Sequence, residues 1–151
     1  MFVPQTNGGT MEFTTGANAW RHYQVMSNEL STPVVVVCPE ESDPQRFRAT
    51  NFTWFNNSNI SFFVGLVPNE TNPQLFLSGD HNLTNGATVK NGMLELTAAQ
   101  PIGWTKEMHN MVGNIGLADG SVQQVSSVGL QSLVASGGAA TNLIQMPVLG
   151  P

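Results

Sequence analysis

The sequence contains a single cysteine, Cys38, and a lone thiol cannot close an internal disulfide. It has five basic residues against ten acidic ones, for a formal net charge of −5. It therefore lacks the clustered Lys and Arg side chains that bind nucleic acids or anionic membrane surfaces. It also lacks an apolar run of about 18 residues, the length of a membrane-spanning helix. These absences exclude a disulfide-stapled fold, nucleic-acid binding and a transmembrane helix within the printed sequence.

Charged residues make up only 10% of the chain, against a typical ~25%. Asn, Thr, Ser and Gln must supply the polar surface instead, a composition typical of extracytoplasmic, β-rich proteins. The length of 151 residues and the hydrophobic content of 40% suit one domain with a real core. We therefore predict a single globular domain over residues 1–151, with 1–16 and 137–151 loosely ordered because Gly and Pro recur there.

Hydrophobic periodicity predicts the main elements. Apolar residues over 18–32 recur at helical spacing, which predicts a helix that is capped by Asn18 and ends before Pro33. The β-branched run 34–38 predicts a buried strand. Further strands are expected over residues 59–67, 74–80 and 93–97, and a second helix over 126–136. The predicted fold class is α+β: an antiparallel sheet with an N-terminal helix and a C-terminal helix.

The clearest local signal is Asp119-Gly120, which lies between two short apolar segments. This dipeptide is typical of a two-residue type I′ turn, so we predict a β-hairpin. In that register Leu117 opposes Val122 and Ile115 opposes Gln124. Ile115, Leu117 and Val122 would then share one face toward the core.

His109 and Asp119 invite a catalytic or metal-binding interpretation. If 114–118 is a strand, Asp119 lies at its far tip, about 20 Å from Gly113. The four residues from His109 to Gly113 reach back at most ~14 Å, so a direct contact is disfavoured. We predict that His109 lies at the base of the hairpin and bonds to backbone, while Asp119 and Gly120 serve the turn. A catalytic or metal pair remains the alternative.

Other candidate sites are few. The apolar approach to Cys38 predicts a buried structural thiol, with no histidine evident beside it to activate a nucleophile. Asp80 and Asn82 offer oxygen ligands for calcium, although the loop is not an EF-hand. The aromatic residues Trp54 and Phe55, surrounded by Asn and Ser, are candidate glycan-binding residues. Phosphate-binding glycine loops and a nucleophile elbow are absent from the sequence, and no cofactor is expected.

Three segments carry a resemblance to a known family. His109, nine residues and then Asp119-Gly120, followed by a return strand, resembles the H-X9-DG domain found at the C-terminal end of bacterial prepilin-like and type II secretion pseudopilin-like proteins. The segments "VVVVCPEESDPQRFRATNF" (34–52) and "FLSGDHNLT" (76–84) are also similar to blocks in these proteins. The family's cleavage site and long N-terminal apolar helix are missing from this sequence.

The resemblance implies the globular head of a type IV pilin or pseudopilin-like protein, a structural and non-enzymatic subunit of the cell envelope. Its expected partners are other pilin-like subunits or the secretion machinery, with membrane contact only through the missing N-terminal helix and inner-membrane anchoring in the full-length form. The expected location is the periplasmic or extracellular face of a bacterial envelope. The resemblance assigns no chemistry to His109, Asp119 or Gly120. A carbohydrate- or calcium-binding extracytoplasmic surface module is the alternative.

Overall fold

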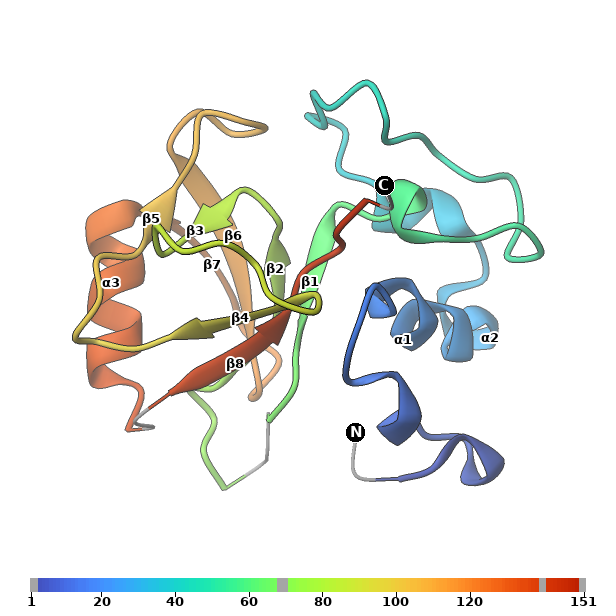
Figure 1. Ribbon diagram of the computed structural model, residues 1–151, viewed down its shortest axis with the longest axis horizontal. Helices are drawn as coiled ribbons and strands as arrows, with labels where there is room; N and C mark the ends of the chain where they lie inside the picture. Colours follow the sequence, from blue (N-terminus) through green and yellow to red (C-terminus); the bar gives the residue numbers. More distant parts are fainter. Residues whose placement is uncertain (1–2, 68–70, 139–140, 150–151) are drawn as a thin grey trace.

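The computed structural model describes residues 3–67, 71–138 and 141–149 of the chain. Its main feature is a six-stranded antiparallel sheet in the order β4-β8-β1-β2-β6-β7. Figure 1 shows helix α3 on one side of the sheet, and helices α1 and α2 with the loop that follows them on the other. The strands are β1 (Phe62–Gly65), β2 (Phe76–Asp80), β4 (Met93–Leu96), β6 (Val112–Leu117), β7 (Val122–Ser126) and β8 (Asn142–Gln145).

A second, two-stranded antiparallel sheet pairs β3 (Leu83–Thr84) with β5 (Gly103–Trp104). Helix α3 (Ser127–Ser136) follows β7 directly, and the Ser126 hydroxyl caps it by accepting from the Gly129 N–H. The α+β class and the antiparallel sheet are therefore confirmed, together with the late helix. In the described part of the chain, no helix has the length and apolar character needed to cross a membrane.

The early helix differs from the prediction. Residues 18–32 form two short helices, α1 (Ala19–Val25) and α2 (Ser27–Leu30), because Met26 leaves helical geometry with a ψ of 19°. Asn18 does not cap α1, since its side chain donates to the Thr15 carbonyl instead. The face of α1 that packs inward carries Ala19, His22 and Tyr23.

The predicted strand over 34–38 is wrong. Pro33–Val36 form a 3-10 helix, η3, which the Thr32 side chain caps by accepting from the Val34 N–H. The proline at the first helical position fixes a helical φ and overrides the β preference of the valines. Three further single turns of 3-10 helix occur among the described residues: η1 (Gln5–Asn7), η2 (Met11–Phe13) and η4 (Asn57–Asn59).

Within the tail 137–151, the expectation of loose order does not hold for residues 142–145, and residues 139–140 and 150–151 lie outside the described part of the chain. Asn142–Gln145 form β8, which pairs with β4 on one side and β1 on the other, so it lies inside the sheet. Ile144 and Gln145 are fully buried. The tail therefore supplies the strand that pairs with both β1 and β4. Of the N-terminal stretch 1–16, the first two residues lie outside the described part of the chain.

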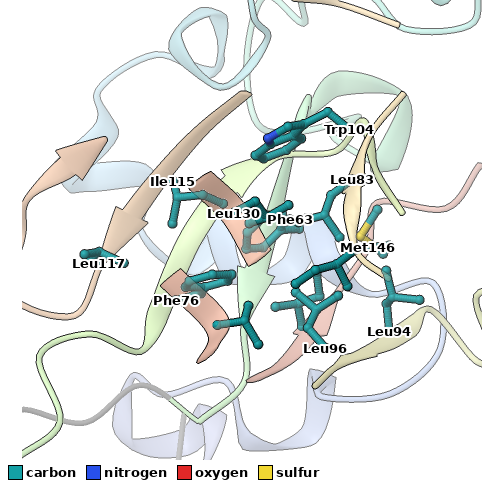
Figure 2. Close-up of a cluster of buried hydrophobic side chains, with 13 residues drawn as sticks. Phe63, Phe76, Leu83, Leu94, Leu96, Trp104, Ile115, Leu117, Leu130 and Met146 are labelled. Carbon is teal, nitrogen blue, oxygen red and sulfur yellow. The ribbon is translucent and has the colours of Figure 1, made fainter. Parts of the chain in front are cut away.

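Two hydrophobic clusters lie on opposite sides of the sheet. The larger, shown in Figure 2, packs between the sheet, the β3-β5 pair and α3, and contains Phe63, Phe76, Trp104, Ile115, Leu117 and Leu130 among others. The smaller joins α1 to the outer face of β1 and the 37–60 loop, with Tyr23, Val36, Phe55, Ile60 and Val64 at its centre. Adjacent β1 residues such as Phe63 and Val64 therefore serve different cores, as the alternation of a strand requires.

The β6–β7 hairpin forms, but its register is one residue away from the prediction. Gly116 pairs with Val122 and Ile115 pairs with Gln123. The loop is Ala118–Gly120: the Gly120 N–H donates to the Leu117 carbonyl, and Gly120 has a φ of +84°. This three-residue loop with one left-handed residue replaces the expected two-residue turn. The shift turns Val122 away from the core, and 71% of its surface is exposed.

Candidate functional site

The structure brings together three side chains that are distant in the sequence: Cys38, Asp80 and His109. Cys38 Sγ lies 3.3 Å from His109 Nε2, and His109 Nε2 lies 3.5 Å from Asp80 Oδ2. One potential ligand atom of each residue lies within 4.8 Å of the other two. Cys38 follows η3, Asp80 ends β2, and His109 belongs to the turn before β6. We call these residues the Cys38–Asp80–His109 cluster.

Asp80 is almost completely buried, with 1% of its side chain exposed. Its Oδ2 accepts hydrogen bonds from the backbone N–H of Asn114 at 2.6 Å and from Asn114 Nδ2 at 2.9 Å. Asn114 belongs to β6, the strand adjacent to β2 in the sheet, so the sheet itself sets the position of this carboxylate. Among the described residues, Asp80 Oδ1 has no hydrogen-bond partner. A buried acceptor without a partner costs about 1–3 kcal/mol, so this atom requires an explanation.

The turn that carries His109 is fixed by hydrogen bonds from Asn82, and its backbone is strained. Asn82 is 1% exposed, and its Nδ2 donates to the carbonyls of Glu107 at 2.8 Å and Val112 at 3.2 Å, one on each side of His109. Three non-glycine residues around His109 have positive φ: Met108 at 57°, Asn110 at 52° and Met111 at 70°. Left-handed backbone at such residues costs free energy and persists only where surrounding contacts enforce it.

Two sequence expectations are corrected here. His109 does lie next to Cys38, although no histidine near the thiol was evident from the sequence, because their contact spans 71 positions. The His109 ring contacts the side chains of Cys38 and Asp80, where bonding to backbone was expected. Asn82, a calcium candidate, uses its amide nitrogen to clamp the turn, while its Oδ1 has no partner among the described residues.

The geometry of the cluster disfavours nucleophilic catalysis. In a catalytic triad the two nitrogens of the histidine face different partners, one the nucleophile and the other the acid. Here the same nitrogen, Nε2, faces both Cys38 and Asp80. Burial raises the pKa of the Cys38 thiol, and the negative charge of Asp80 raises it further. Both effects favour the protonated thiol over the reactive thiolate.

A second polar network, centred on Glu41, lies next to the cluster in the sequence. Glu41 Oε2 accepts from Ser61 Oγ at 2.6 Å and from His81 Nε2 at 2.9 Å. Burial opposes ionisation of this carboxyl, but the hydrogen bonds from His81, Ser61 and the Asp43 N–H lower the pKa of Glu41 to about 2. The Arg46 guanidinium lies 3.8 Å away and donates to the carbonyls of Asn57, Ile60 and Pro147. The network joins β1 and the 41–46 loop to the C-terminal tail.

Asp119 and Gly120 lie at the opposite end of β6 from His109. The Asp119 carboxylate accepts from the N–H and hydroxyl of Ser121, at 2.9 and 2.7 Å. These local bonds lower the pKa of Asp119. The strand between the two sites, Val112–Leu117, is six residues long, which corresponds to about 20 Å. The carboxylate of the H-X9-DG pattern therefore serves the turn, whereas the carboxylate that contacts His109 is Asp80.

The two aromatic candidates for glycan binding are in different environments. Trp54 is 86% exposed, next to a shallow pocket that is also lined by Phe47, Arg48 and Asn51. Phe55 is 2% exposed and packs edge-on against Trp20 and Phe52. The assignment of Phe55 as a binding residue is therefore wrong, because its ring fills the core beneath α1.

The remaining histidine, His22, is on α1 and bonds outside the cluster. Its Nε2 donates to Gln145 Oε1 at 2.8 Å, and burial lowers its pKa. The Gln145 amide in turn donates to the carbonyls of Phe13 and Gly16. Each histidine thus has its own partners, and the structure gives no support to a three-histidine metal site among the described residues.

Sequence reasoning missed Glu41 and Asn114 completely. Neither belongs to a spaced motif, and both owe their roles to strand pairing and loop closure. Comparison with known proteins finds no matching family model, no matching curated protein and no matching solved structure.

Proposed function

We propose that the chain is the globular head of a pilin-like or type II secretion pseudopilin-like protein, which acts through protein–protein contacts in the cell envelope and not as an enzyme. The observation that carries this proposal is an apolar groove of about 540 Å³ on the α1 side of the sheet. Its apolar lining comes from the N-terminal segment, α1 and strands β1 and β2, and includes Val3, Val25, Met26, Val64 and Leu77.

The groove suits a protein partner because its exposed side chains are aliphatic. Val3, Met26 and Leu77 are each between 42% and 47% exposed, so they keep apolar surface in contact with solvent. Clustered exposed apolar residues mark interaction sites on soluble domains. The expected occupant is an apolar helix of a pilin-like subunit, which would bury these residues.

The segments of the family resemblance meet in the structure. Cys38 belongs to the 34–52 block, Asp80 to the 76–84 block, and His109 begins the H-X9-DG pattern. Their side chains form the cluster described above. The cluster joins three segments of the chain and contains a buried carboxylate and a strained turn. These features favour a structural role, in which the cluster keeps the head rigid, over a catalytic role.

Cell fractionation of the full-length native protein tests the proposed location. The protein should be in the envelope fraction, anchored in the inner membrane through a helix that precedes these residues, and protease added to spheroplasts should cleave the head. Recovery in the cytoplasm, protected from protease in intact spheroplasts, would refute the proposal.

The groove is tested by Leu77→Asp, with Val128→Asp as the matched control. Val128 is 78% exposed, is on α3 and is not among the groove residues. Leu77→Asp should reduce co-purification of pilin-like subunits from native cells and leave the melting temperature nearly unchanged, whereas Val128→Asp should change neither. Equal co-purification with both variants would contradict a docking role for the groove.

One observation favours a second candidate, an extracytoplasmic glycan-binding module: the 86% exposure of Trp54 beside a shallow pocket. Aromatic rings presented in this way can stack on apolar faces of ligands. Calorimetry with a panel of glycans tests it, with Trp54→Ala as the control. Binding heat that disappears in Trp54→Ala would favour this alternative. Calcium is less well supported, because Asp80 lies beside a thiol and an imidazole, which are not calcium ligands.

A further inference from the structure

We propose that Cys38, Asp80 and His109 bind a divalent metal ion of the zinc class, which ties three distant segments of the chain together. This site goes beyond the proposed function and does not depend on it. It is derived from the geometry of the cluster, the identity of the three groups and a buried oxygen that the protein leaves unpaired.

Two of the three distances within the cluster match zinc coordination. Zinc binds sulfur at about 2.3 Å, nitrogen at about 2.0–2.1 Å and carboxylate oxygen at about 2.0–2.2 Å, with tetrahedral geometry. Those bond lengths place ligand atoms about 3.3–3.6 Å apart. The sulfur-to-nitrogen distance here is 3.3 Å and the nitrogen-to-oxygen distance is 3.5 Å. The ligand atoms of Cys38 and Asp80 lie within 4.8 Å of each other, so they must approach by at most about 1.2 Å to complete the set.

Hydrogen bonding alone does not satisfy this arrangement. His109 Nε2 can either donate one proton or accept one, yet it faces the Cys38 sulfur and the Asp80 carboxylate together. Whichever bond it makes, the other neighbour is left without one from the ring. Asp80 Oδ1 also has no partner in the described part of the chain, although the side chain is 1% exposed. A metal ion accepts electron pairs from all three groups at once.

The charges and the types of ligand agree with a zinc-class ion. A thiolate and a carboxylate carry two negative charges, which a divalent cation neutralises, so the occupied site has no net charge. When the ion binds, the Cys38 sulfur exchanges its proton for the metal, and the proton passes to solvent. Thiolate and imidazole ligands select zinc and similar transition metals, whereas magnesium and calcium require oxygen ligands.

The surroundings supply the support that metal ligands need. The Asn114 N–H and amide hold the Asp80 carboxylate, and Asn82 holds the turn of His109. Such outer contacts orient ligands and commonly change metal affinity by about 10–100-fold when removed. The His109 side chain is 17% exposed, which gives an ion a route from solvent.

Cobalt spectroscopy on the wild-type domain tests the proposal directly. The protein is freed of metal with a chelator and titrated with Co²⁺, whose thiolate complexes have a charge-transfer band in the near ultraviolet. We expect one equivalent of Co²⁺ to produce this band, Zn²⁺ to abolish it by displacement, and Zn²⁺ to raise the melting temperature. Absence of the band and of any shift in melting temperature would overturn the proposal.

Variants assign the ligands. Cys38→Ser should lose the charge-transfer band, and His109→Gln should lose tight binding of one equivalent. His22→Gln, the matched control for His109→Gln, and Asp119→Asn, which changes a carboxylate outside the cluster, should keep both properties. Asn114→Ala should weaken Co²⁺ binding by about 10–100-fold. A band that persists in Cys38→Ser, or that disappears equally in His22→Gln, would refute the site.

A thiol-labelling experiment on the wild-type protein avoids variants that fold poorly. Cys38 is the single cysteine, so an Ellman-type reagent reports on this site alone. Zn²⁺ should slow labelling of the native protein, and a chelator should restore the original rate. An unchanged rate at saturating Zn²⁺ would contradict coordination by Cys38.

Discussion

The two ends of the β6–β7 hairpin differ in how they are held. At the base, His109 contacts side chains 71 and 29 positions away in the sequence, on a turn that contains three residues with positive φ. At the tip, the Asp119 side chain bonds only two residues ahead, to Ser121, and Gly120 alone takes a positive φ, while the N–H groups of Ala118 and Asp119 donate to the Leu75 and Pro73 carbonyls. The side-chain contacts at the base are tertiary, and those at the tip are local. Substitutions at the base should therefore disturb the whole domain, and substitutions at the tip should have small effects.

The largest contrast should come from glycine substitutions. A Cβ at Gly113, near the base, would lie 2.5 Å from the ring of buried Trp104, whereas a Cβ at Gly120 would meet nothing within 4 Å. Gly113→Ala should lower the free energy of unfolding by about 3 kcal/mol through overpacking. Gly120→Ala should cost only about 1 kcal/mol, because a positive φ is unfavourable for alanine. Urea unfolding measures both, and equal costs would contradict the comparison.

The free energy of unfolding should decrease in acid because of Glu41. The folded pKa is about 2 against an ordinary value of 4.5, so the unfolded chain binds the proton more readily. The stability due to Glu41 is therefore complete above about pH 4.5 and is lost as the pH falls through 2, with a total on the order of 3 kcal/mol. Urea unfolding at several pH values should show this loss in the wild type.

Glu41→Gln is the control for this acid effect. Its free energy of unfolding should be lower than that of the wild type at neutral pH and should fall less steeply between pH 4.5 and 2. Parallel curves for the wild type and Glu41→Gln would show that other carboxyl groups cause the acid response.

His109→Ala should lower the free energy of unfolding by about 2 kcal/mol when measured without metal. The substitution removes the contact with Cys38 and leaves Asp80 buried without this neighbour. Thermal and urea unfolding in the presence of a chelator measure the change. A melting temperature equal to that of the wild type would mean that His109 has no architectural role.

The smallest effect is expected for Asp119→Asn. The exposed Asp119 side chain bonds to Ser121 alone, and asparagine keeps an oxygen that accepts the same bonds. The melting temperature should change less than in His109→Ala. A larger loss at the tip than at the base would reverse the comparison between the two ends.

Local signals in the sequence predicted the local structure. Asp119-Gly120 marked the turn, and the helical spacing after Ser126 marked α3, because turn chemistry and capping act over a few residues. The register of the hairpin was not predictable in the same way. Two-residue and three-residue loops both suit Asp-Gly, and the one that forms brings Ala118 against Leu75 and turns Val122 to solvent.

The cluster could not be predicted from spacing. Cys38 follows η3, where a strand was predicted, and Asp80 is fixed by the pairing of β2 with β6. The tail was misjudged for a similar reason, since β8 is stable only between β1 and β4. The cluster and β8 both depend on contacts between distant segments, and such contacts cannot be identified from the spacing of residues in one sequence.

Double-mutant cycles in the presence of a chelator test whether His109 is coupled to Cys38 and independent of Asp119. One cycle combines Cys38→Ala with His109→Ala, and a second combines Asp119→Ala with His109→Ala. We expect an interaction free energy of at least about 0.5 kcal/mol between Cys38 and His109, and additive changes in the free energy of unfolding for Asp119 with His109. Additive effects in the first cycle together with coupling in the second would contradict the assignment of His109 to the contact with Cys38.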